Sequence, residues 1–145
     1  MTATTRFGRV GLAFGLVTLV ALLGVQSLGA QDTKAADRER LLKGRACDRC
    51  DLSGVNFLRE DLKGVSASEA NLTQAMFYRA DLSGANLGGA NLEKANLSFA
   101  NLTNTNLSNA NLAGANLGSS TGASIAGAIT TETTTCPDGH AGPCR

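Results

Sequence analysis

Hydrophobic positions recur every five residues through the middle of the chain. From Cys50 to Ser119 the sequence divides into fourteen blocks of five, and the middle residue of each block, its centre, is Leu in eleven of them. The residue before the centre is Asn or Asp in twelve blocks, and the residue two before it is Ala in nine. A period of five fits neither a helix nor a strand. So short a repeat predicts stacked coils in which every block has the same surroundings.

The blocks resemble the A-(N/D)-L-x-x unit of the pentapeptide-repeat family, and the unit runs without interruption from Ala85 to Leu102. The resemblance implies an all-β fold, a right-handed quadrilateral β-helix in which each block forms one side and twenty residues form one coil. It also implies that the centre and the residue two before it point inward, while the other three point outward. Residues 47–119 would then make about three and a half to four coils, a short stack whose ends need caps.

The polar positions suit this architecture. An Asn before the centre can bond to the Asn one coil away and so form a ladder along the stack. Gly occupies the position two after the centre in five blocks, where a corner with a positive φ would favour it. These residues are Gly54, Gly64, Gly84, Gly89 and Gly114.

One block departs from the inward pattern. Glu60 occupies a position that holds Ala in most blocks, and an unpaired charge in the interior would be costly. We expect the coil to open locally there, or Glu60 to lean outward toward Arg59 or Arg79. Asp61 and Asp81 would stack on the neighbouring side, and we interpret them as wall residues rather than as an acid–base pair.

In this architecture the residue twenty positions later is the neighbour in the next coil. When outward residues are grouped in this way, one surface differs from the rest by its aromatic and Arg residues. This candidate interaction patch consists of Leu58, Arg59, Tyr78, Arg79 and Phe99. Aromatic residues and Arg are enriched where proteins bind each other, and we expect a cation to lie over a ring here. The alternative is an ordinary surface of scattered apolar residues in which the C-terminal tail covers Phe99.

Two segments flank the repeats. Residues 30–46 are charged and favour a short capping helix that ends near Gly44, with Leu41 and Leu42 packed over the first coil. In residues 120–145 the five-residue period stops and Thr and Ser become frequent. We interpret this tail as irregular strand that closes the C-terminal end, with a disordered linker as the alternative.

The four cysteines lie outside the regular blocks or at their edge, Cys47 and Cys50 at the start and Cys136 and Cys144 in the tail. Four cysteines allow three pairings. Because the two pairs should lie at opposite ends of the stack, we favour the local disulfides 47–50 and 136–144. The alternatives are a redox role for the C-x-x-C motif and a zinc site formed by Cys136, His140 and Cys144. We predict no cofactor and no bound metal.

Residues 1–29 have the three parts of a secretory signal. Arg6 and Arg9 precede the uncharged run from 10 to 25, and small residues lie before Ala30. Cleavage would make the protein secreted or periplasmic. The alternative is an uncleaved anchor, the one case in which we expect contact with a membrane.

The net charge of the chain limits the classes of function that it can have. Removing residues 1–29 takes two Arg from the 13 basic residues and leaves 11 against 12 acidic ones, a net charge of −1. This balance argues against nucleic-acid binding, and no catalytic constellation stands out. We predict a non-enzymatic structural or protein-binding module of the cell envelope, with an unidentified protein partner or a homodimer through the solenoid ends. The alternatives are a DNA mimic that protects a topoisomerase, which the family resemblance suggests, and a redox or metal-binding protein.

Overall fold

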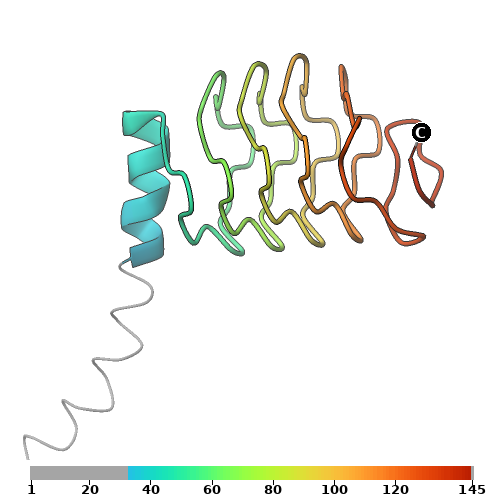
Figure 1. Cartoon of the computed structure of the whole chain (residues 1–145). Helices are drawn as coiled ribbons and strands as arrows, with labels where there is room; N and C mark the ends of the chain where they lie inside the picture. Colours follow the sequence, from blue (N-terminus) through green and yellow to red (C-terminus); the bar gives the residue numbers. More distant parts are fainter. Residues whose placement is uncertain (1–32, 145) are drawn as a thin grey trace, which may run out of the picture. The chain divides into compact units, whose positions relative to one another are not determined.

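The computed structural model describes residues 33–144, which form one helix followed by a stack of coils (Figure 1). The predicted export signal or anchor, residues 1–29, lies outside the described residues. Within 33–144 the one helix is too short and too polar to cross a bilayer. The helix covers residues 33–44, inside the segment for which the sequence indicates a cap.

Parallel β-bridges join each coil to the next and confirm the spacing of twenty residues. Four columns of bridges begin at Ala46, Asp51, Asn56 and Asp61, one for each side of the coil. The backbone hydrogen bonds run in both directions between neighbouring coils. The N–H of Leu52 donates to the carbonyl of Asn71 (2.8 Å), and the N–H of Asn71 donates to the carbonyl of Cys50 (2.9 Å). Each side turns after one bridge, so the described β-structure consists of single bridges rather than long strands.

The interior is a column of Leu and Ala. All eleven Leu centres are at most 1% exposed, and so are the nine Ala two residues before a centre. The rings of Phe57 and Phe77 stack in this column, with centroids 5.1 Å apart and planes 7° from parallel. Burial of each Leu or Phe side chain stabilises the fold by about 1.5–3 kcal/mol, so the main role of the repeated apolar residues is to pack the interior.

The corners have a left-handed backbone in all fourteen blocks. The five predicted glycines have φ between 61° and 69°, which confirms their role. The other nine blocks place an ordinary L-residue at the same corner with φ between 56° and 59°. That conformation costs about 1–2 kcal/mol for a residue with a Cβ, and the ladders on both sides of each corner hold it there.

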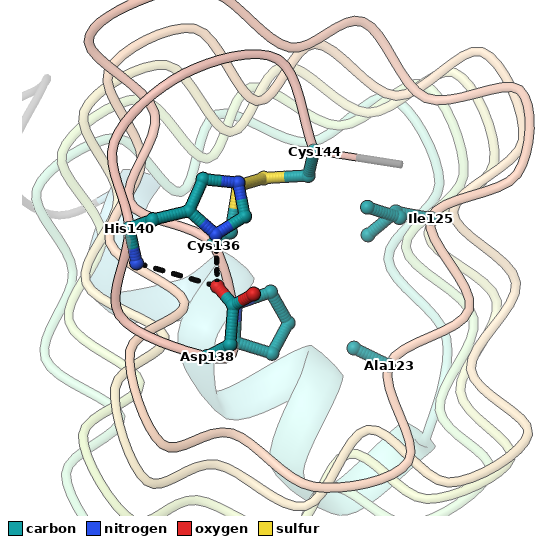
Figure 2. A pocket seen from close by; sticks show the side chains of 7 residues that line it. Ala123, Ile125, Cys136, Asp138, His140 and Cys144 are labelled. Atoms are coloured by element: carbon teal, nitrogen blue, oxygen red, sulfur yellow. Dashed lines mark hydrogen bonds and ion pairs between the residues drawn. A yellow bond between two sulfur atoms is a disulfide. The ribbon is translucent and has the colours of Figure 1, made fainter.

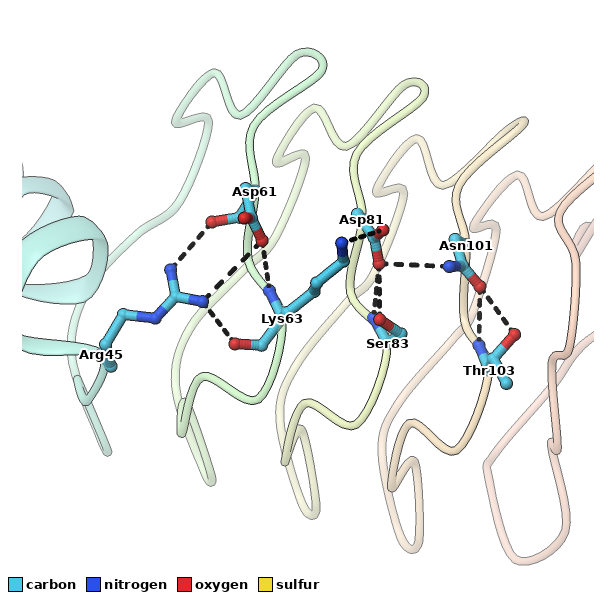
Figure 3. Close-up of polar contacts among 7 residues, drawn as sticks. All are labelled: Arg45, Asp61, Lys63, Asp81, Ser83, Asn101 and Thr103. Atoms are coloured by element: carbon cyan, nitrogen blue, oxygen red, sulfur yellow. Dashed lines mark hydrogen bonds and ion pairs between the residues drawn. The ribbon is translucent and has the colours of Figure 1, made fainter.

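Polar side chains form the expected ladder on the outside of the coils. In the column of Figure 3, the Nδ2 of Asn101 donates to the Oδ1 of Asp81 (3.2 Å) one coil below. The Oδ1 of Asn101 accepts from the backbone N–H and the hydroxyl of Thr103 (3.1 and 2.7 Å). Asp fills the acceptor role equally well but cannot donate, so in a side-chain bond between two ladder positions the donor is Asn.

The helix of residues 33–44 covers the first coil. Leu41 is 1% exposed and Leu42 packs against the core. The Nζ of Lys34 donates to the Oγ of Ser53 (2.6 Å), and the Nε of Arg38 donates to the carbonyl of Asn56 (3.2 Å). These contacts fix the helix over the open end of the column and shield the apolar interior from water.

Glu60 does not open the coil, and its partner differs from the one we expected. The N–H of Glu60 donates to the carbonyl of Phe57 (3.1 Å), and the carbonyl of Glu60 accepts from Asp81 (3.0 Å), so the turn and the bridge are both intact. The carboxylate leans outward but pairs with Arg38 of the helix, not with Arg59 or Arg79. The period of five carries no information about where the helix lies, so the sequence did not reveal this partner.

The ladders continue beyond the fourteenth block. Asn101 pairs with Thr121 at the regular spacing of twenty, whereas Asn111 pairs with Ile129 and Asn116 with Thr135, at spacings of 18 and 19. Part of the predicted irregular tail is therefore a shortened coil. Thr135 then pairs in antiparallel fashion with Ala141, which turns the last residues back across the end of the stack.

Candidate interaction surface

One side of the stack carries most of the exposed large apolar side chains. We name it the aromatic–arginine face, formed by Leu58, Arg59, Met76, Tyr78, Arg79 and Phe99. Four large hydrophobic residues are well exposed in the described chain, and three belong to this face: Leu58 (49%), Met76 (43%) and Phe99 (51%). Ile129 is the fourth. Such clustering is typical of a surface that contacts another molecule.

The structure brings the aromatic and cationic members of the patch into direct contact. The rings of Tyr78 and Phe99 meet edge to face, with centroids 5.5 Å apart and planes at 66°. The guanidinium carbon of Arg79 lies 5.2 Å from the centroid of Tyr78 and 5.8 Å from that of Phe99, so the expected cation–π contact is present. The tail does not cover Phe99, since half of its surface is exposed. Leu58 and Arg59 lie one coil nearer the helix.

Met76 belongs to this face, and the sequence reasoning did not include it. It occupies the ladder position before a centre, and its backbone still bridges Asn56 and Asn96. Its side chain offers no oxygen, so the polar ladder of this side is interrupted. The sequence contained a signal for this difference, because the block of Met76 is one of only two that lack Asn or Asp before the centre.

The sulfurs of all four cysteines are joined in disulfides. Cys47 pairs with Cys50 and Cys136 with Cys144, and the Cα atoms lie 5.5 Å apart in each pair. Zinc binds thiolate sulfur, and a disulfide supplies none. The clusters of Asp37 with the first pair, and of Asp138 and His140 with Cys136, are therefore not metal sites as they stand.

The C-terminal disulfide borders a small hollow at the end of the stack (Figure 2). The hollow measures about 250 Å³ and is lined mainly by Ala123, Ile125, the disulfide, Asp138 and His140. The carboxylate of Asp138 pairs with Nδ1 of His140, and the backbone N–H of His140 lowers the pKa of Asp138 below its ordinary value. Both side chains are more than half exposed, so their pair is weak.

Asp61 and Asp81 stack on the neighbouring side, as the sequence indicated (Figure 3). Lys63 lies 3.3 Å from Asp81, and Arg45 lies 3.8 Å from Asp61. Burial alone would raise the pKa of Asp81, but hydrogen bonds from Ser83 and the ammonium of Lys63 outweigh it and hold the pKa below its ordinary value. A carboxylate that stays ionised among fixed partners serves the wall and is poorly suited to proton transfer.

Comparison with known proteins agrees with this architecture. A family model described as pentapeptide repeats matches in eight copies over residues 47–84 and 80–118. No curated protein matches the chain. The chain is similar to the crystal structure of the pentapeptide repeat protein Rfr23 from the cyanobacterium Cyanothece 51142, with 30% identity and a TM-score of 0.51, covering 69% of this chain and 97% of that one.

Two further solved structures are similar in sequence. A pentapeptide repeat protein from the Arabidopsis thaliana thylakoid lumen is 37% identical, with a TM-score of 0.40 over 68% of this chain and 73% of that one. HetL, a pentapeptide repeat protein from Nostoc sp. strain PCC 7120, is 32% identical, with a TM-score of 0.41 over 66% and 42%. The repeats, their register and the likeness to Rfr23 lead to one conclusion: this chain belongs to the pentapeptide-repeat family.

Proposed function

We propose that this protein is a non-catalytic interaction module that is exported and binds another protein through the aromatic–arginine face. The observation that carries the proposal is the contact of Tyr78, Arg79 and Phe99 on an exposed surface. Tyr and Arg dominate the binding energy of protein interfaces. The coils beneath hold these side chains on a regular backbone, so binding would order little that is not already ordered.

Export to the periplasm or the exterior is supported by two independent features. Residues 1–29 have the pattern of a cleavable signal. The two disulfides, one near each end of the repeats, suit an oxidising compartment. Cleavage after Gly29 would leave residues 30–145 as the mature protein.

The surface favours this function over the topoisomerase-protecting alternative. A mimic of DNA needs a surface of like negative charges, whereas the most distinctive surface of the described chain carries arginines and aromatic rings. The redox alternative would require a thiol pair that cycles between two states. Cys47 and Cys50 are at most 7% exposed, which limits access to such a reaction.

Affinity capture tests the proposal. The tagged protein is used to capture partners from the envelope fraction of the source organism, in parallel with Arg79→Glu and with Arg49→Glu as the matched control. Arg49 also sits at a left-handed corner, but two corners away around the coil. We expect a partner that the parent and the control capture and Arg79→Glu loses. Equal capture by all three would show that this face is not the binding surface.

Export is tested separately by the intact mass of the protein recovered from the cell envelope and the medium. We expect a mass that lacks residues 1–29. A protein that retains them in the membrane fraction would be an anchored form, and one found in the cytosol would contradict export.

A further inference from the structure

Two arginines of the wall have no carboxylate partner within residues 33–144, although nearly every other basic residue described there has one. Ten Lys and Arg lie between Lys34 and Lys94, and seven of them lie within 4.0 Å of a carboxylate. The three others in this part of the described chain are Arg40, Arg59 and Arg79. Arg40 lies on the helix and points to the sulfur of Cys50, which leaves two unpaired guanidiniums on the coils.

The two arginines occupy neighbouring positions of the aromatic–arginine face. Arg59 and Arg79 occupy the same left-handed corner of successive coils, with φ of 58° in both. Coils are spaced about 4.8 Å apart, as strands are in a sheet, and the N–H of Arg59 donates to the carbonyl of Tyr78 (3.1 Å). The two side chains therefore leave the wall at neighbouring positions of adjacent coils, where like charges are unfavourable without a counter-ion. One carboxylate could lie within reach of both guanidiniums.

The apolar side chains around the pair define the rest of the ligand. Tyr78 and Phe99 flank Arg79, and Leu58 borders a shallow depression of about 430 Å³ that Arg38, Asn56 and Glu60 also line. A ligand that carried only charge would leave these surfaces in water. A ligand with apolar side chains beside its carboxylates would cover them.

We propose that the partner docks on this face through an acidic segment in extended conformation, with a carboxylate between Arg59 and Arg79 and apolar side chains against Leu58, Tyr78 and Phe99. This inference rests on the proposed function and specifies the chemistry of its partner. Carboxylates pair with guanidinium by charge-assisted hydrogen bonds, which are stronger than neutral ones. In an extended segment every second side chain lies on the same face, so an acidic and an apolar residue two positions apart would both contact the wall.

An anionic membrane is a poorer match for the same surface. Attraction to such a membrane contributes about 1 kcal/mol per basic residue, and clusters of four to eight are typical of membrane-binding proteins. The described face offers two unpaired arginines. A second copy of the chain is also a poorer match, since most carboxylates of the described wall are already paired with their own cations.

Fluorescence anisotropy with a labelled peptide tests the inference. The probe is a short peptide in which Glu and Leu take turns at every second position with Ser between them, so that both face the same way when the peptide is extended. The control peptide has Lys in place of Glu. The disulfide-bonded exported protein should bind the Glu peptide and not the Lys peptide. Arg59→Gln combined with Arg79→Gln should weaken binding by about tenfold or more. Arg49→Gln removes the same charge from a corner with the same backbone and should leave binding unchanged.

The aromatic part of the face is tested with substitutions that the stack already accommodates. Ser98 and Ser119 occupy the columns of Tyr78 and Phe99, so Tyr78→Ser with Phe99→Ser should fold and should also weaken binding. Circular dichroism of each variant verifies that the coils are intact. A double-serine variant that binds the Glu peptide as well as the parent would overturn the apolar part of the proposal.

Three other results would overturn the proposal. The first is equal binding of the Glu and Lys peptides. The second is Arg79-dependent binding to vesicles of anionic phospholipid without binding to the peptide, and the third is Arg79-dependent self-association in sedimentation velocity. If the peptide fails while envelope capture still depends on Arg79, the acidic-segment inference is wrong and the proposed function stands. If capture is also independent of Arg79, the proposed function fails with it.

Discussion

Two neighbouring sides of the same coils differ in what their outer positions do. We call the side with Asp61, Lys63, Asp81, Ser83, Asn101 and Thr103 the ladder face (Figure 3). On it, each outward group bonds to another group of the wall. On the aromatic–arginine face the ladder is broken at Met76, and the guanidiniums of Arg59 and Arg79 have no carboxylate partner among residues 33–144. Both sides bury large apolar centres, Leu on the ladder face and Phe and Leu on the aromatic–arginine face, so interior packing sets the fold and the outer positions are free to differ.

The largest effect should come from the interior of the aromatic–arginine face. Phe77→Ala removes a buried ring that stacks on Phe57 and should cost about 3–5 kcal/mol in the free energy of unfolding. Phe99→Ala on the outside of the same side should cost only about 0.5–1.5 kcal/mol, the contribution of its contact with Tyr78. Urea unfolding followed by circular dichroism measures both. Similar losses for the two variants would contradict the division between inner and outer positions.

A smaller effect should distinguish the two ladders. Asn101→Ala removes the bond to Asp81 and two bonds from Thr103, which should cost about 1–2 kcal/mol. Asn96→Ala on the aromatic–arginine face removes only the bonds from Ser98, since Met76 is its neighbour one coil below. The difference between the two unfolding free energies should be about one hydrogen bond. Equal costs would mean that the inter-coil bond contributes nothing.

Corner strain should be measurable as a gain in stability. Gln74→Gly relieves a positive φ of 59° at the corner before the aromatic–arginine face and should stabilise the fold by about 0.5–1 kcal/mol. Arg79→Gly relieves the same strain at the corner after it but loses the contacts with Tyr78 and Phe99, so its gain should be smaller. Thermal unfolding of both variants tests this. A larger gain for Arg79→Gly would indicate that those contacts do not stabilise the free protein.

The smallest effect should be the pH dependence of the ladder face. The pKa of Asp81 is lower in the folded protein than its ordinary value. Its contribution to stability is therefore present above about pH 4, the pKa of an unfolded Asp, and is lost as the pH falls through the lower folded value. Asp81→Asn should keep stability at pH 7 within about 0.5 kcal/mol and should reduce the loss at pH 3. Unfolding curves at both pH values test this. If Asp81→Asn loses as much stability between pH 7 and pH 3 as the parent, other carboxylates cause the loss.

The period of five predicts whatever depends on a residue's place within its coil. The buried Leu and Ala, the Asn ladder and the contact of Arg79 with Phe99 follow from counting in fives and twenties. Features set by neighbours outside the period do not follow. Glu60 meets Arg38 only because of where the helix packs. The left-handed backbone at Arg79 and Phe99 does follow from the period, because both hold the corner position that Gly fills in other blocks, although their own preference is against it. The sequence shows Met76 as an exception to the repeat, but only the structure shows that its exposed side chain belongs to the same face as Tyr78 and Arg79.

The clamped ends of the stack have a consequence for how the protein opens. Each coil bonds only to the coils beside it, so amide groups exchange with solvent by fraying inward from an end. At one end the helix and the disulfide of Cys47 hold the first coil, and at the other the disulfide of Cys136 holds the last turns. Amides near Leu87, midway between the clamps, should exchange most slowly. A proteolytic enzyme would therefore find few loose segments to cut within residues 33–144.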